Sequence, residues 1–170
     1  MTVNERIAAL REKMQERKID AYLVPTDDFH ASEYVGEYFK CRKYITGFTG
    51  SAGTAVILQD MAGLWTDGRY FIQAAAQLEG TGVELFKMGE PGVPTVHEFL
   101  EEKLGDGMCL GFDGRTVNAK EAVELKKILG KKGAFLSVDY DLIGEVWENR
   151  PALSCEPVTE LRSEERRVGK

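Results

Sequence analysis

Residues 54–78 read TAVILQDMAGLWTDGRYFIQAAAQL, and they carry the strongest indication of the fold. Its first half contains two short runs of apolar and β-branched residues, 54–59 and 63–66, which are typical of the strands of a β-hairpin. Asp67 follows as the expected N-cap of a helix that ends near Leu78. The residues expected to face inward from that helix are Phe71, Ala75 and Leu78. A hairpin that leads into a helix predicts a sheet that is antiparallel in part and has a helix packed against it.

Strands and helices alternate through the rest of the chain. Further strands are expected at residues 21–25, 83–88, 108–112 and 134–138. Helices are expected at residues 4–18, 96–104, 119–130 and 142–147, and capping boxes open the first two, at Thr2 with Glu5 and at Thr95 with Glu98. Residues 26–43 show no period and predict a long loop with one helical turn. The pattern predicts an α/β domain built on a mixed, mostly parallel six-stranded sheet with helices on both faces.

The composition is that of an ordinary globular domain. The chain has 170 residues, of which 43% are hydrophobic and 29% are charged, and its net charge is −6. This composition argues against a disordered chain, and the negative charge argues against binding nucleic acid. No apolar run reaches the length of about 18 residues that a membrane-spanning helix needs, and residues 1–18 lack the apolar core of a secretory signal. Three widely spaced cysteines fit a reducing compartment, so we expect a cytoplasmic protein.

The chain divides into one domain and two short C-terminal pieces. Residues 1–150 are expected to form the domain, and Arg150-Pro151 marks its end. Residues 151–161 show no hydrophobic period and are expected to be a linker. Residues 162–170 hold four cations, two anions and one sizeable apolar residue, so we expect a disordered tail there.

The residues that could bind a metal are few and scattered. The chain has two histidines and no His-Glu-x-x-His motif. His97 and Glu101 share one face of a predicted helix, and such a pair is more often a solvated surface. Asp27, Asp28 and His30 could bind a cation, but a turn rich in aspartate explains them as well. We therefore predict no metal-binding residue in this chain.

Nucleophilic catalysis is equally weakly supported. Ser51, His30 and Asp67 could supply the side chains of a Ser-His-Asp triad, but Ser51 lies in Gly-Ser-Ala-Gly rather than in Gly-x-Ser-x-Gly. The glycines at 47, 50 and 53 precede a strand rather than a helix, which favours a close-packed turn over a phosphate-binding loop. Cys41 is flanked by two cations that could activate its thiol, but an unreactive thiol is favoured. We predict no catalytic residue.

The residues alone leave two interpretations open for Arg69. It falls in the first turn of the predicted helix, where a cation opposes the positive end of the helix dipole. It also follows the carboxyl end of a strand, where α/β sheets bind ligands. Arg69 therefore either pairs with Asp67 or Glu33, or contacts a ligand.

Several segments, taken together, resemble the N-terminal domain of cytosolic-type Xaa-Pro aminopeptidase (aminopeptidase P). The resemblance covers residues 5–161, and the ordered set of motifs is far more specific than any one of them. It does not continue into residues 162–170. The matching segments are Asp20-Ala21-Tyr22-Leu23-Val24-Pro25, Asp28-x-His30-x-Ser32-Glu33-Tyr34, Cys41-Arg42, residues 47–55, Trp65-Thr66-Asp67-Gly68-Arg69-Tyr70-Phe71, Lys87-Met88-Gly89, Pro94-Thr95, Gly111-x-Asp113 and Trp147-x-x-Arg150-Pro151.

The resemblance implies a creatinase/prolidase-like fold and a place in a larger metallopeptidase. Members of that family remove the residue that precedes proline. Their C-terminal "pita-bread" domain holds two metal ions, usually manganese, on two Asp, one His and two Glu. That domain is absent from residues 1–170, so the chain alone is expected to be inactive. The implied partners are a proline-containing peptide substrate and a second subunit in a homodimer.

Within this chain the resemblance assigns a role to one residue. The arginine of the family's Asp-Gly-Arg-Tyr motif reaches the entrance of the active site, and Arg69 matches it. Arg69 is therefore expected to bind substrate. The expected function is substrate gating and subunit contact by a non-catalytic domain. The alternative is an autonomous peptide- or protein-binding module with the same fold and no enzyme activity.

Overall fold

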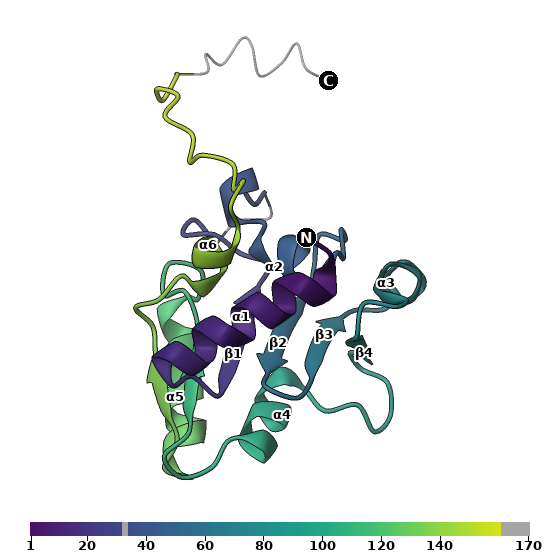
Figure 1. The fold of residues 1–170 in the computed structure, drawn as a ribbon, viewed down its shortest axis with the longest axis vertical. Coiled ribbons are helices and arrows are strands. Elements are labelled where there is room, and N and C mark those ends of the chain that lie inside the picture. Colours follow the sequence, from purple (N-terminus) through teal and green to yellow (C-terminus); the bar gives the residue numbers. More distant parts are fainter. Residues whose placement is uncertain (32–33, 161–170) are drawn as a thin grey trace.

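A computed structural model describes residues 1–31 and 34–160 (Figure 1). Its six strands are β1 (Ala21–Pro25), β2 (Thr54–Leu58), β3 (Ala62–Thr66), β4 (Val83–Lys87), β5 (Cys109–Gly111) and β6 (Phe135–Ser137). Its helices are α1 (Val3–Arg17), the 3-10 helix η1 (Glu37–Phe39), α2 (Cys41–Thr46), α3 (Phe71–Leu78), α4 (Val96–Lys103), α5 (Ala119–Gly130) and α6 (Leu142–Val146).

The strands form a single mixed sheet in the order β4-β3-β2-β1-β5-β6. The antiparallel pairs are β1 with β2 and β2 with β3, whereas β3 with β4, β1 with β5 and β5 with β6 are parallel. The predicted hairpin is therefore β2–β3, with Thr54 opposite Trp65 and Ile57 opposite Ala62. The predicted fold class, a mixed and mostly parallel six-stranded sheet, is confirmed.

Helices cover both faces of the sheet, and successive strand residues alternate between the two cores. Tyr22 and Val24 of β1 belong to the core that also contains the buried residues of α1, α2, α3 and α6. Ala21 and Leu23 of the same strand belong to the opposite core, beneath α4 and α5. The second core includes Trp65, whose ring stacks on that of Phe86 at a centroid distance of 4.0 Å.

Two helix predictions need correction. The helix after β3 begins at Phe71 rather than at Asp67, and Tyr70 occupies its N-cap position. The carboxylate of Asp67 instead accepts a hydrogen bond from the backbone N–H two residues later, at 3.0 Å, which makes a turn before the helix. Of the three residues expected to face inward, Leu78 is buried, Phe71 is partly buried and Ala75 is exposed, and Ala74 is buried in place of Ala75. The predicted loop 26–43 contains η1 and the start of an unpredicted helix, α2.

The chain leaves the domain beside Arg150, whose side chain is only 8% exposed. Its guanidinium stacks over the ring of Tyr38 at 3.7 Å and donates to the carbonyl of Tyr38 at 2.8 Å. It also pairs with Asp141. Beyond it, residues 151–160 have no regular secondary structure, are exposed, and extend away from the sheet (Figure 1). The tail predicted at 162–170 lies outside the described residues.

Among the helices of the described ranges, none combines the length and the apolar character that crossing a bilayer requires.

Candidate functional site

The candidate site lies at one edge of the sheet. Strands β1, β3, β4 and β5 run in one direction, so their carboxyl ends meet at this edge. Strand β2 runs the opposite way and begins there, which brings the preceding glycines to the same edge. Ligands of α/β sheets bind at such an edge, where loops leave the strand ends. We refer to residues 47–53 as the glycine loop.

The glycine loop is packed too tightly to accept side chains at two positions. A Cβ atom on Gly50 would lie 2.3 Å from Cζ of Phe48 and 2.8 Å from Cδ1 of Tyr70. A Cβ atom on Gly53 would lie 2.9 Å from the carbonyl oxygen of Trp65. These distances support a close-packed turn into β2, the interpretation that the sequence favours over a phosphate-binding loop.

Arg42 of α2 binds the backbone of the glycine loop through hydrogen bonds. Its side chain is buried, at 3% exposure for the residue. Its Nη1 donates to the carbonyl of Phe48 at 2.7 Å and its Nη2 donates to the carbonyl of Gly50. Its Nε donates to the hydroxyl of Thr26 at 2.8 Å, at the end of β1. Burial lowers the pKa of the guanidinium to about 10, so it remains charged at neutral pH.

The outer side of the loop is fastened to α3 and to the residue before it. The hydroxyls of Ser51 and Tyr70 lie 2.6 Å apart. The backbone N–H of Thr49 donates to the side-chain oxygen of Gln77 at 2.9 Å, and Gln73 donates to the Thr49 hydroxyl at 2.9 Å. The segment that carries Arg69 is therefore braced against the glycine loop.

Arg69 lies in the turn before α3, so the predicted conflict with a helix dipole does not arise. Its guanidinium makes two contacts with Asp67, Nε to Oδ1 at 2.9 Å and Nη2 to Oδ2 at 2.8 Å. The side chain is still 69% exposed. The hydrogen bond from the Arg69 side chain is the main reason that the pKa of Asp67 falls to about 2. The ion pair with Asp67 thus orients an exposed guanidinium. Pairing and ligand contact, the two interpretations of Arg69, are therefore compatible.

The other candidates from the sequence have separate partners. His97 lies 2.6 Å from Oε1 of Glu121, which joins α4 to the first turn of α5. Asp28 accepts a hydrogen bond from the backbone of His30, as in an aspartate turn. Asp67, His30 and Ser51 each contact a different group, so no triad is assembled by the contacts above. No group of three or more His, Cys, Asp or Glu in residues 1–31 and 34–160 could hold a metal ion.

The cysteines differ sharply in their surroundings. Cys41 and Cys109 are buried and Cys155 is exposed. Burial raises the pKa of Cys41 to about 12 and that of Cys109 to about 11. The cations beside Cys41 in the sequence therefore do not activate it, as predicted.

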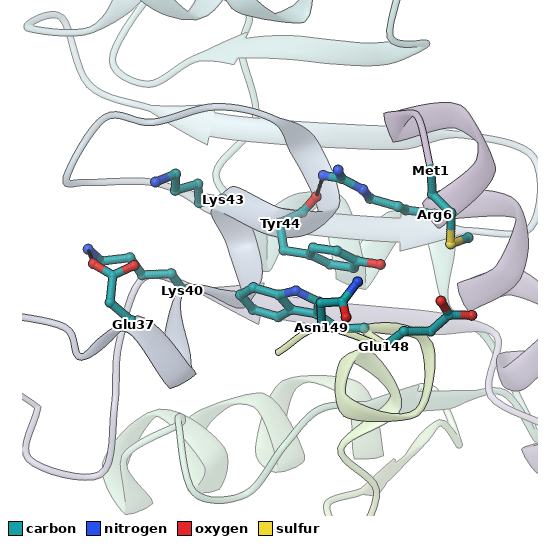
Figure 2. A pocket seen from close by; sticks show the side chains of 9 residues that line it. Met1, Arg6, Glu37, Lys40, Lys43, Tyr44, Glu148 and Asn149 are labelled. Carbon is teal, nitrogen blue, oxygen red and sulfur yellow. Dashed lines mark hydrogen bonds and ion pairs between the residues drawn. The ribbon is translucent and has the colours of Figure 1, made fainter. Parts of the chain in front are cut away.

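The described residues form several cavities near this edge or beside α2, and three of them lie close to the glycine loop or to Tyr44 of α2. The first, of about 550 Å³, lies among the carboxyl ends of the strands and the first residues of α4 and α5, and the side chains of Asp27, His97 and Glu121 line it. The second, of about 390 Å³, is lined by Tyr44 and Trp147, whose rings stack at 4.4 Å (Figure 2). The third, of about 300 Å³, lies between the glycine loop and α2, and Arg42 is among its lining residues.

Comparison with known proteins places this domain in a family. Residues 6–145 match the family described as the creatinase/prolidase N-terminal domain. The chain belongs to the creatinase/prolidase N-terminal domain family. Among curated relatives of this domain, aminopeptidase P2 of Arabidopsis thaliana is 43% identical over 156 residues, which is 89% of this chain and 22% of the relative. A probable Xaa-Pro aminopeptidase P of Pyrenophora teres f. teres is 44% identical over 155 residues, 90% of this chain and 24% of the relative.

Two solved peptidase structures contain a domain that is similar to this creatinase/prolidase N-terminal domain. The X-prolyl aminopeptidase of Caenorhabditis elegans, described as a cytosolic enzyme with a di-nuclear active site, matches with a TM-score of 0.88 and 36% identity, over 96% of this chain and 28% of its own. The N-terminal domain of the cytoplasmic peptidase PepQ of Mycobacterium tuberculosis matches with a TM-score of 0.60 and 26% identity, over 84% of this chain and 98% of its own. The chain thus spans about a quarter of the curated relatives, and its resemblance to the N-terminal domain of Xaa-Pro aminopeptidases is confirmed.

Sequence reasoning missed Arg42 and Tyr70 as organisers of the site. Arg42 lies in a stretch without a clear period and attracts attention in the sequence only beside Cys41, whereas Tyr70 falls within the predicted helix but outside its inward-facing set. The signal that could have found Arg42 is a cation shortly before the Tyr-Ile-Thr-Gly segment at 44–47, in a stretch otherwise able to form a buried helix. The role of Arg42 becomes visible only in the folded domain, where its guanidinium donates to Thr26, Phe48 and Gly50.

Proposed function

We propose that this chain is the non-catalytic N-terminal domain of an Xaa-Pro aminopeptidase, where it gates access of proline-containing peptides and contributes subunit contacts. The observation that carries the proposal is the exposed Arg69 guanidinium, held by Asp67 at the carboxyl edge of a domain whose curated relatives are Xaa-Pro aminopeptidases. A planar guanidinium can hold a peptide carbonyl or carboxylate with two parallel hydrogen bonds.

The chemistry of peptide cleavage would belong to the part of the protein outside this chain. The described residues do not fit a metal ion, since none of their acidic, histidine or cysteine groups gather in threes. Two manganese ions in a catalytic domain would supply the activated water of a metallopeptidase. The work of this chain's own residues is to orient the substrate: Arg69 binds the peptide, and Asp67 and Tyr70 hold Arg69.

The proposed assembly is a cytoplasmic homodimer. Its support is the family resemblance and the description of the nematode relative as a cytosolic enzyme. Domain limits at 1–150 and a linker at 151–161 are part of the same proposal, supported by the position of Arg150 at the chain exit.

The proposal is tested by the reading frame downstream of the codon for residue 161, and by activity. We expect that frame to supply two Asp, one His and two Glu, and its long product to release the first residue of Xaa-Pro peptides when manganese is present. The pure 170-residue chain should release none under the same conditions. Release by the short chain, or a native stop codon near residue 170, would contradict the proposal and favour an autonomous binding module.

A further inference from the structure

Arg42 is a buried cation whose hydrogen-bond partners are all neutral. Its three acceptors are the hydroxyl of Thr26 and the carbonyls of Phe48 and Gly50, and none of its contacts with described residues is to a carboxylate. Buried charges in proteins are usually paired, because removing a cation from water is costly unless an opposite charge lies near. The carbonyl dipoles compensate part of that cost. An anion beside Arg42 would compensate more of it.

The cavity between the glycine loop and α2 could admit such an anion. We call this 300 Å³ space the Arg42 cavity; its lining residues are Thr26, Tyr34, Val35, Phe39, Lys40, Arg42, Lys43, Thr49, Gly50 and Ser51. Three of these residues are cations, and no Asp or Glu occurs among the described residues that line it. Lys40 is paired with Glu37. Lys43 is exposed and forms no ion pair within residues 1–31 and 34–160.

The Arg42 cavity adjoins the residues that hold Arg69. Ser51 lines the cavity, and its hydroxyl lies 2.6 Å from that of Tyr70. The guanidinium of Arg69 lies over the same Tyr70 ring, 5.3 Å from its centroid. Tyr70 therefore links a residue that lines the Arg42 cavity to the side chain of Arg69.

We propose that the Arg42 cavity binds the C-terminal carboxylate of a short peptide. The carboxylate would lie between Arg42 and Lys43, and the hydroxyl of Ser51 would donate to it while accepting a hydrogen bond from Tyr70. The peptide as carrier of the carboxylate rests on the proposed function, whereas the preference for an anion rests on the cavity alone. Such a site would favour peptides short enough to place their free end there, and so would set an upper length for the substrate.

The test compares Gly-Pro-Gly with its C-terminal amide, titrated into the ¹⁵N-labelled 170-residue chain and followed by backbone NMR shifts. We expect the free acid to bind at least about tenfold more tightly than the amide, because one charge-assisted contact to a buried cation is lost in the amide. The shifts should concentrate at Lys43, Thr49, Gly50 and Ser51. Equal binding of acid and amide, or acetate binding as tightly as the tripeptide, would overturn the proposal.

Variants locate the site. Lys43→Gln should weaken binding of the acid about twofold to fivefold, as expected for an exposed charge pair, and leave the amide unchanged. Lys126→Gln, on the exposed side of α5, removes the same charge elsewhere and should change neither. Arg42→Gln should abolish the difference between acid and amide, provided that its melting curve shows a folded protein. If Arg42→Gln unfolds, Lys43→Gln still tests whether the carboxylate binds in the Arg42 cavity. An unchanged affinity of Lys43→Gln for the acid would overturn that location.

This outcome is separable from that of the proposed function. The short chain reports the preference for a carboxylate, whereas cleavage is measured in the long protein. A long protein that cleaves Xaa-Pro peptides while the short chain binds acid and amide equally would overturn only the Arg42 cavity. Acid-selective binding by the short chain without cleavage by the long protein would overturn only the aminopeptidase assignment.

Discussion

At the scale of single residues, Arg69 and Asp67 form an ion pair that remains exposed to solvent. Two contacts from one guanidinium to one carboxylate leave little freedom in the direction in which the remaining N–H groups point. Binding loses less conformational entropy when the side chain is already oriented. Replacing Arg69 should therefore affect substrate binding more than it affects folding.

Arg69→Ala in the long protein should lower kcat/KM for Xaa-Pro peptides by about tenfold to a hundredfold. Arg69→Lys should fall in between, because it keeps the charge and loses the planar pair of donors. The melting temperature should change little, since exposed ion pairs contribute little stability. Steady-state kinetics over a series of peptide lengths, with Lys126→Ala as the control, measures the effect. Normal kinetics together with a lowered melting temperature would show that Arg69 only pairs with neighbouring side chains.

The glycine loop makes a second prediction at this scale. Gly50→Val and Gly53→Val should each lower the free energy of unfolding by about 1–3 kcal/mol, because the new side chains overlap an aromatic ring or a backbone carbonyl. Gly105→Val is the matched control, since a Cβ atom there would meet nothing within 4 Å. Urea denaturation measures all three. A loss at Gly105 as large as that at Gly50 would mean that crowding is not the cause.

At the scale of elements, the sequence predicted best those helices and strands whose ends carry their own signals. The capping box of Thr95 and Glu98 begins α4 as expected, and Asn118 caps α5. The start of α3 was predicted too early, because Asp67 carries the side chain of an N-cap but uses it in a turn. Helix α2 was missed because it is six residues long and has no side-chain cap, so its stability comes from tertiary contacts such as those of Arg42.

The cap of α4 can be tested directly. Thr95→Ala removes the acceptor that binds the backbone N–H of Glu98 at 3.2 Å, and should lower the free energy of unfolding by about 0.5–2 kcal/mol. Glu124→Ala, at an exposed position within α5, should change it by less than about 0.5 kcal/mol. Equal effects of the two substitutions in urea denaturation would show that the cap contributes nothing.

At the scale of the whole molecule, the alternation of strands and helices predicted the class of fold but not the order of the strands. The pairing of β1 with β5 joins residues nearly ninety positions apart, and it depends on crossovers whose direction no local motif records. The same limit applies to the candidate site. Arg69 could be singled out by its position after a strand, whereas the Arg42 cavity is created by segments that meet only in the folded domain.

The burial of two thiols has a practical consequence for chemical labelling. Maleimide reacts with exposed thiolates, so the folded protein should take up about one equivalent, at Cys155, and about three after denaturation. Mass spectrometry of the native and the denatured adducts would count them, and fast uptake of two or three in the native state would contradict the burial of Cys41 and Cys109. Because Cys155 lies beyond the chain exit, a dye can be attached to the exposed segment 151–160 of the folded domain without any mutagenesis, and its fluorescence anisotropy would report the motion of that segment.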